Sequence, residues 1–213
     1  MFSVARARFA QKVIASRVIE EDALPHEIKT VAGVDVAHSG STAVASAVLV
    51  DFHNLELTSY AIVKTQVRVP YIPTLLAFRE AGPMIAAVRK LDAEPDVLMV
   101  DGNGRLHPLG AGIACQIGLV LDKPTIGVAK KLLCGTLGEW RGREAPIQLS
   151  GKVIGMALKT SSRPIYVSVG HKISLSTAAS IVWKCTRKGL RLPEPIRLAH
   201  IVATAAARDQ RAS

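Results

Sequence analysis

Apolar and polar residues follow two periods along the chain, and the change of period separates predicted helices from predicted strands. Within residues 1–19 the apolar positions recur at helical spacing, at Val4, Phe9, Val13, Ile14 and Val18. This stretch is basic and free of acids, which would also suit a transit peptide. The helical spacing favours a structured amphipathic helix.

Three β-prone segments follow, at residues 30–37, 42–51 and 55–67. The turns between them are short, which is typical of consecutive antiparallel strands. Helical spacing returns over residues 74–91, but a Gly-Pro pair at 82–83 interrupts it. Because proline breaks or kinks a helix, we expect one helix to end near Glu80 and a second to start at the proline.

A β-α-β unit comes next, with buried strands at residues 96–101 and 124–129 joined by an apolar helix at 111–121. Strands joined in this way run parallel. Two more strands and two helices follow, at residues 151–159, 165–169, 176–187 and 194–208. The pattern predicts an α/β fold, in which a mixed sheet, antiparallel in its first three strands and then parallel, is flanked by helices. No linker divides the chain, so we expect residues 1–213 to form one domain.

Three carboxylates stand in positions typical of a metal site. Asp35 interrupts an apolar strand, Asp101 ends a buried strand, and Glu80 lies between them in sequence. A buried acid is costly unless it is paired or coordinated, and Mg²⁺ prefers oxygen ligands. Ligands of open α/β sheets bind at the carboxyl ends of strands. If the two strands are neighbours, Asp35 and Asp101 can share one ion.

Charge and cysteine content narrow the partner and the compartment. The 213 residues include 27 basic and 17 acidic ones, a formal charge of +10, which favours nucleic acid or an anionic membrane surface as the partner. An ordinary basic cytosolic protein is the alternative. The three cysteines, Cys115, Cys134 and Cys185, form neither a disulfide framework nor a zinc pattern. We expect a cytoplasmic protein, and no stretch approaches the ~18–20 apolar residues of a membrane span.

Two loops add candidate binding residues. Tyr71, Ile72 and Pro73 belong to a rigid tip that is either an apolar wedge for a duplex or an ordinary strand-to-helix connection. Gly102 and Gly104 follow Asp101 and would let the backbone approach a bound group, although their spacing is no dinucleotide fingerprint.

Three basic residues are each open to two interpretations. His107 precedes a proline in the glycine-rich loop and is either functional or satisfied by backbone groups. Lys130 ends a predicted strand and either neutralises a phosphate near the carboxylates or is solvated. His200, on the last predicted helix, is by itself more typical of a structural histidine.

Six segments, taken in order, resemble the endonuclease V family of deoxyinosine 3′-endonucleases and span nearly the whole chain. They are residues 33–36 (GVDV), 70–80 (PYIP and LLAFRE), 96–108 (with the core VDGNG), 124–131 (PTIGVAKK), 170–171 (GH) and 191–197 (RLPEPIR, leading to His200). One such segment can arise by chance, whereas the ordered set indicates the family.

The resemblance implies a ribonuclease-H-like fold, which agrees with the predicted mixed sheet. It implies that Asp35 and Asp101 bind Mg²⁺, for which Mn²⁺ would substitute. Glu80 would be the third catalytic carboxylate and a further metal ligand. Lys130 and His200 would lie near the scissile phosphate.

The resemblance also assigns DNA-binding residues. The wedge that separates the strands would be the tip at residues 71–73. The pocket for the extruded hypoxanthine would be formed by Gly102, Gly104 and Gly127, with the neighbourhoods of Leu76 and Leu133. His107 is counted with these DNA-binding residues.

The implied activity is hydrolysis of the second phosphodiester 3′ to a deoxyinosine in damaged DNA, leaving 3′-hydroxyl and 5′-phosphate ends. We expect a monomer. Two alternatives stay open: a ribonuclease for inosine-containing RNA and a non-catalytic nucleic-acid-binding domain. The chain departs from the family pattern at Thr74, Leu109 and Gln116, where glycine, arginine and histidine are usual. These changes spare the carboxylates but bear on base preference and DNA affinity.

Overall fold

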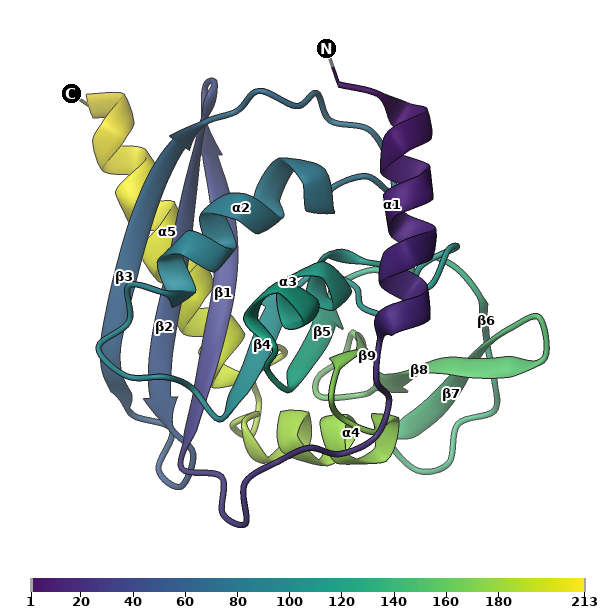
Figure 1. The fold of residues 1–213 in the computed structure, drawn as a ribbon. Coiled ribbons are helices and arrows are strands. Elements are labelled where there is room, and N and C mark those ends of the chain that lie inside the picture. Colours follow the sequence, from purple (N-terminus) through teal and green to yellow (C-terminus); the bar gives the residue numbers. More distant parts are fainter. Residues whose placement is uncertain (1, 213) are drawn as a thin grey trace.

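The protein, seen in a computed structural model that describes residues 2–212, is built around one mixed sheet of nine strands (Figure 1). The strand order is β3-β2-β1-β4-β5-β9-β8-β7-β6. The strands are β1 Thr30–Ser39, β2 Thr42–Asp51, β3 Leu57–Gln66, β4 Val97–Asp101, β5 Thr125–Ala129, β6 Thr136–Leu137, β7 Glu144–Leu149, β8 Lys152–Leu158 and β9 Ile165–His171. The helices are α1 Val4–Arg17, α2 Ala77–Val88, α3 Ile113–Leu121, α4 Leu175–Lys184 and α5 Glu194–Ala212.

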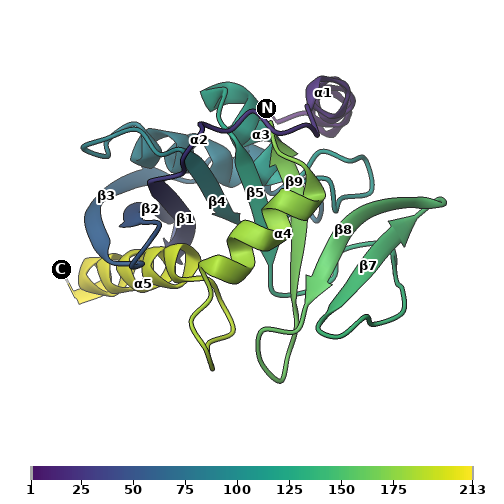
Figure 2. The same ribbon diagram turned by 90° about the horizontal axis from the view of Figure 1, so that it is seen from below.

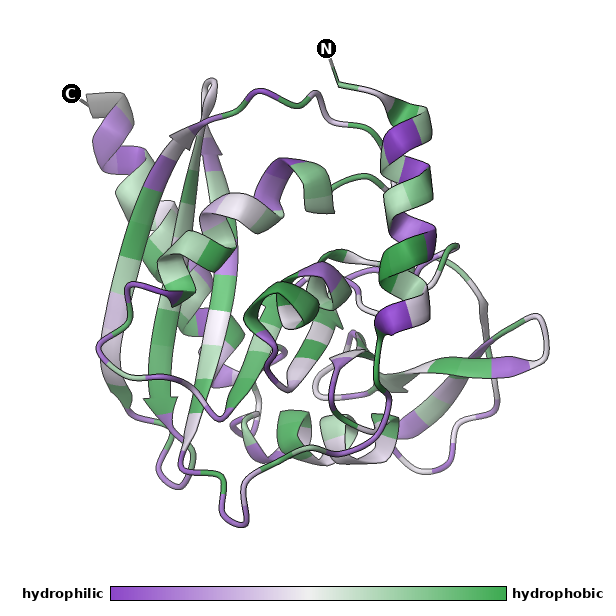
Figure 3. Ribbon diagram, in the orientation of Figure 1, coloured by the Kyte–Doolittle hydropathy of each residue, from purple (hydrophilic) through white to green (hydrophobic). Residues whose placement is uncertain are grey.

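Helices cover both faces of the sheet, α2 and α3 on one side and α4 and α5 on the other (Figure 2). Alternation along β1 explains the two layers, because successive strand side chains point to opposite faces. Val31 packs in the core beneath α4 and α5, whereas Ala32 and Val34 pack in the core beneath α2 and α3. The central strands are therefore apolar on both faces, as their colouring in Figure 3 shows.

The sheet confirms the predicted directions of the first five strands. The first three strands form an antiparallel meander, and β4 and β5 run parallel to β1. Beyond β5 the strands are again antiparallel, and β6 and β7 were not predicted. β6 has only two residues, and Pro146 within β7 obscures the alternation that signals a strand.

The predicted helix break at residues 82–83 is wrong, because α2 continues through Pro83. Glycine before the proline removes the Cβ that would clash with the proline ring in helical conformation. Pro83 is also buried against the core, which offsets the missing backbone hydrogen bond. Glu80 consequently lies in the first turn of a single helix rather than at the end of a short one.

The N-terminal helix is confirmed, but its predicted apolar face is only partly buried, through Val13 and Ile14. Phe9 is 70% exposed and Val4 is 45% exposed, and the helix buries Ala7 and Gln11 instead. α1 packs on the outside of α3 rather than on the sheet (Figure 1). The fully buried residues of α1 are therefore a small residue and an amide, and no apolar residue of its predicted face is fully buried.

Candidate active site

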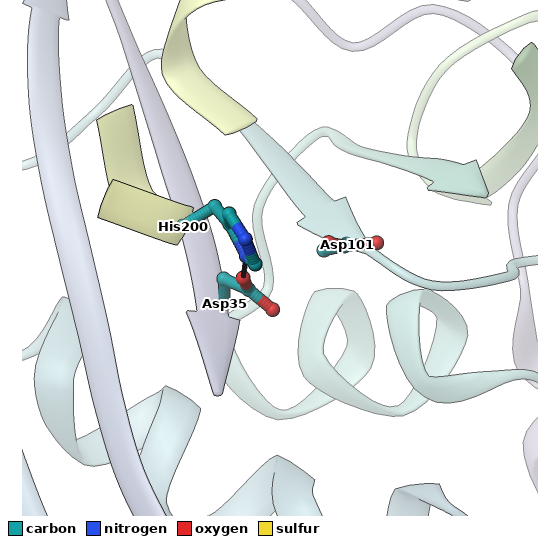
Figure 4. A group of neighbouring side chains, drawn as sticks. All are labelled: Asp35, Asp101 and His200. Carbon is teal, nitrogen blue, oxygen red and sulfur yellow. Dashed lines mark hydrogen bonds and ion pairs between the residues drawn. The ribbon is translucent and has the colours of Figure 1, made fainter. Parts of the chain in front are cut away.

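Asp35 and Asp101 lie side by side at the centre of the sheet. In the parallel register of β1 and β4, Val34 pairs with Val100, and the two aspartates are the next residue on each strand. Val34 and Val100 face α2 and α3, so alternation turns both aspartates toward the opposite face. Figure 4 shows the two side chains converging there. The two strands are neighbours, so the condition that the sequence left open for a shared ion is met.

Helix α5 brings His200 to the same place. A methyl group at Gly33 would lie 2.0 Å from the Pro195 carbonyl oxygen, so only glycine lets the start of α5 rest on β1. Farther along the helix, the Ala199 carbonyl accepts a hydrogen bond of 2.7 Å from the Ser46 hydroxyl of β2. His200 then donates from Nδ1 to Asp35 Oδ2 over 2.7 Å (Figure 4). The geometry gives His200 a partner in the site that its helical position did not reveal.

Lys130 forms an ion pair with Asp101 from the end of β5. Arg191 fixes the main chain of Lys130, because its Nη2 atom donates a hydrogen bond of 2.6 Å to the Lys130 carbonyl. The same nitrogen donates to the Pro164 carbonyl at 2.9 Å. Sequence reasoning placed Arg191 only within a matching segment and gave it no role. The signal that could have identified Arg191 is the partial burial of its side chain, which is visible only in the fold.

The electrostatics of the acid pair call for a cation. Burial raises the pKa of the Asp101 carboxyl, and the nearby charge of Asp35 raises it further, while Lys130 and His200 oppose the shift. Two carboxylates this close repel each other unless positive charge lies between them. One lysine and one half-exposed histidine share that task here.

The donor set fits a divalent metal ion. Asp35, Asp101 and His200 each offer a ligand atom, and these atoms lie within 4.8 Å of one another in the part of the chain that the structure describes. Carboxylate oxygens are the ligands that Mg²⁺ and Mn²⁺ prefer, and an imidazole nitrogen is acceptable to Mn²⁺.

Glu80 lies apart from this group of three. Its Oε1 atom is 2.7 Å from His38 Nε2, and only 12% of its side chain is exposed. Burial raises the pKa of Glu80, and the hydrogen bond from His38 opposes that shift. The negative charge of Asp101 also raises the pKa of Glu80, so Glu80 lies close enough to Asp101 for their charges to interact. His38 was not singled out from the sequence.

A cavity of about 510 Å³ adjoins Asp101. Asp101 and Lys130 line one side of it, and Gly102, Leu76 and Leu133 line other parts, as predicted for the base pocket. Gly104 and Gly127 are absent from the lining. A methyl group on Gly104 would lie 2.0 Å from the Val169 carbonyl oxygen, and one on Gly127 would lie 2.5 Å from the Gly104 nitrogen. These two glycines let the loop after β4 lie directly on β5 and β9.

The tip at residues 71–73 forms the rim of this cavity. Tyr71 lines the cavity and is 68% exposed. The Leu75 N–H donates to the Ile72 carbonyl at 3.0 Å, which closes a four-residue turn with Pro73 second and Thr74 third. Thr74 has φ +67°, so the turn is of type II, which favours glycine at that position. This conformation explains why the glycine of the family pattern suits the position.

His107 lies behind the rim and is only 3% exposed. Leu109 N–H donates to its Nδ1 at 3.1 Å, so the ring proton is on Nε2, which donates to the Thr74 carbonyl at 3.0 Å. Burial lowers the pKa of His107, which favours this neutral form. Of the two interpretations, backbone groups do satisfy the ring, although the residue also touches the cavity.

The mixed sheet with the paired aspartates at its centre places the protein in the ribonuclease-H-like class. Comparison with known proteins makes the assignment narrower. The family model for endonuclease V matches residues 12–201. The chain belongs to the endonuclease V family, as its sequence motifs implied.

Relatives cover almost all of the chain. An endonuclease V of Thermofilum pendens is 57% identical over 209 residues, which are 97% of this chain and 90% of the relative. The crystal structure of endonuclease V from Streptomyces avermitilis superposes with a TM-score of 0.91 at 34% identity, covering 99% of this chain and 96% of that one. A Ciona intestinalis endonuclease V, bound to DNA containing an inosine followed by a ribo-adenosine, superposes with a TM-score of 0.88 at 29% identity over 97% of both chains. No helix within residues 2–212 of the present chain is long and apolar enough to cross a membrane.

Proposed function

We propose that this nuclease cleaves DNA at deoxyinosine, hydrolysing the second phosphodiester 3′ to the lesion and leaving 3′-hydroxyl and 5′-phosphate ends. The observation that carries the proposal is that one member of the acid pair lies in the wall of a cavity that can hold a base. Asp101 belongs to both. The inosine-containing DNA bound to the Ciona relative supports the substrate.

Asp35 and Asp101 are the residues that would hold Mg²⁺ or Mn²⁺. When bound, the ion lowers the pKa of a water molecule and neutralises charge on the phosphate. His200 keeps one oxygen of Asp35 oriented through its 2.7 Å hydrogen bond. Glu80, held through Oε1 by His38, keeps its other oxygen available to orient the attacking water or to hold a second ion.

Lys130 supplies a point charge on the cavity side of the acid pair. Its side chain is 35% exposed and lines the cavity, so a phosphate oxygen can reach the ammonium group. It stabilises the negative charge that develops on the phosphate during hydrolysis. Arg191 keeps the lysine in place by binding its carbonyl group.

Lesion recognition combines the cavity with the tip at residues 71–73. The exposed ring of Tyr71, with Ile72 and Pro73, enters the duplex and separates its strands. The extruded hypoxanthine occupies the cavity lined by Gly102, Leu76 and Leu133. Gly104 and Gly127 let the loop that carries Gly102 pack against β5 and β9, and His107 supports the rim of the cavity. Hypoxanthine pairs weakly, so its extrusion costs less than that of a matched base.

We further propose that residues 1–213 act as one domain and as a monomer in the cytoplasm. The three cysteines, Cys115, Cys134 and Cys185, are free, which suits a reducing compartment.

Mapping the nick on a duplex with a single deoxyinosine tests the proposal. In Mg²⁺ the wild-type protein should cut the second phosphodiester 3′ to the lesion, and EDTA should abolish the nick. A nick at another position, or none, would overturn the assignment. A non-catalytic binder would instead retain the duplex in EDTA without cutting it in Mg²⁺. Matched oligonucleotides with inosine in RNA distinguish the ribonuclease alternative.

A further inference from the structure

The turn that presents Tyr71 contains a strained residue. Thr74 has φ +67°, in the left-handed region that β-branched residues rarely occupy. Such conformations persist only where surrounding contacts hold them. The contacts that hold Thr74 come from two distant segments of the chain.

Both contacts end on the Thr74 carbonyl oxygen. Gln11 Nε2, on α1, donates to it at 2.7 Å, and His107 Nε2 donates at 3.0 Å. Each donor is itself oriented by a second hydrogen bond. Arg8 Nη1 donates to Gln11 Oε1 at 3.0 Å, and Leu109 N–H donates to His107 Nδ1. The direction of the carbonyl, and with it the orientation of the turn, is therefore set from outside the turn.

Gln11 is an unusual anchor for a peripheral helix. It is 1% exposed, whereas Phe9 of the same helix is 70% exposed. A helix that served only to cover the core would bury its apolar residues and leave its amides in water. The buried amide instead reaches a carbonyl 63 residues away in sequence.

We propose that Gln11 is a positioning residue for strand separation: with His107 it clamps the Thr74 carbonyl and so holds Tyr71, Ile72 and Pro73 in the orientation that enters the duplex. This inference rests on the proposed function of the tip. It makes helix α1 part of the recognition apparatus, although α1 supplies none of the acids. Gln11 acts through the turn and touches neither the base nor the phosphate.

The test compares duplex with single-stranded substrate, because only the duplex requires strand separation. Gln11→Met keeps the size of the side chain and removes the donor. We expect kcat/KM on a deoxyinosine duplex to fall about fivefold, the size of one hydrogen bond, while kcat/KM on single-stranded deoxyinosine DNA stays within about twofold of wild type. Ile14→Ala, at a partly buried apolar position of the same helix, is the matched control. It should lower Tm without a duplex-specific loss.

Equal losses on both substrates, or no loss on either, would overturn the proposal. Hydrogen exchange of residues 70–76 in the free protein gives a second readout, and Gln11→Met should accelerate it while Ile14→Ala should not. Unchanged exchange would also overturn the clamp. If Gln11→Met fails to fold, Gln11→Asn, which is too short to reach the carbonyl, takes its place. If the wild-type protein does not cut deoxyinosine DNA, but Gln11→Met still accelerates hydrogen exchange of residues 70–76, the proposed function fails. The positioning of the turn by Gln11 would then still hold.

Discussion

Asp101 of the acid pair and the segment at residues 71–74 line the same cavity, but the acid pair and this segment are held in place by different means. Asp35 and Asp101 sit on neighbouring parallel strands, so the backbone hydrogen bonds of the sheet fix their separation. The turn is held by side-chain hydrogen bonds from α1 and from the loop after β4. The residues proposed for hydrolysis thus lie on regular strands of the sheet, whereas the residues proposed to open the duplex lie on an irregular turn.

This difference predicts two kinds of variant. Changes at the acid pair should remove cleavage on every substrate and spare binding. Changes at the turn should spare cleavage wherever the base is already unpaired. The expected effects below run from the largest to the smallest.

Asp101→Asn should lower kcat on a deoxyinosine duplex by at least about a thousandfold, because the substitution removes a carboxylate needed to hold the ion. Binding of the duplex, measured by fluorescence anisotropy, should persist. Asp96→Asn is the matched control, since Asp96 caps the start of β1 through the Lys29 and Thr30 N–H groups and lies outside the site. An Asp101→Asn protein that nicks within tenfold of wild type would remove the residue from the chemistry.

Lys130→Gln should lower kcat about a hundredfold, because a positive charge beside the phosphate is lost. KM should change less, since the protein retains 26 of its 27 basic residues to attract the DNA backbone. Lys123→Gln, at the opposite end of β5 and paired with Glu94, provides the control. A large rise in KM with unchanged kcat would assign Lys130 to binding rather than to the reaction.

Tyr71→Ala should lower kcat/KM on duplex about tenfold, because the ring can no longer stack in the opened helix. Single-stranded deoxyinosine DNA should be cut nearly as well as by wild type. Tyr60→Ala removes a ring that is 58% exposed on β3 and should leave both substrates unaffected. If Tyr71→Ala cuts duplex at the wild-type rate, the tip is an ordinary connection and not a wedge.

His107→Gln should change the pH dependence of stability slightly. Burial lowers the pKa of His107, so the folded protein keeps the ring neutral while the unfolded chain titrates near 6.5. The stability that neutral His107 contributes is complete above about pH 6.5 and is lost as pH falls toward the folded pKa. The difference in free energy of unfolding between wild type and variant, from urea titrations, should therefore narrow below pH 6.5. A difference in free energy of unfolding that widens below about pH 6.5 would contradict a neutral His107. Burial also lowers the pKa of His171, but both proteins contain His171, so its effect cancels in the difference.

Regular periodicity made the acid site predictable. The strand patterns already singled out Asp35 and Asp101, and a shared ion required only that their two strands be neighbours, which the pattern left open. The same reasoning misplaced Glu80 at the end of a short helix, whereas it lies in the first turn of α2. Whether the helix continues past Gly82 and Pro83 depends on the burial of Pro83, which a sequence pattern does not report.

The clamp could not be predicted in the same way. Gln11 lies among apolar residues of an apparently amphipathic helix, yet it is the amide and not Phe9 that is buried. Its partner is a carbonyl group, and any residue can supply one. Likewise His38 and Arg191 bind groups 42 and 61 residues distant, and neither contact leaves a period or a spacing in the sequence.

Location of Mn²⁺ by anomalous diffraction from crystals grown with the ion tests the central claim most directly. The account predicts a peak between the carboxylates of Asp35 and Asp101, within reach of both. A protein that cuts deoxyinosine DNA in Mn²⁺ but shows its peak elsewhere, with the two aspartates bridged by no ion, would contradict it.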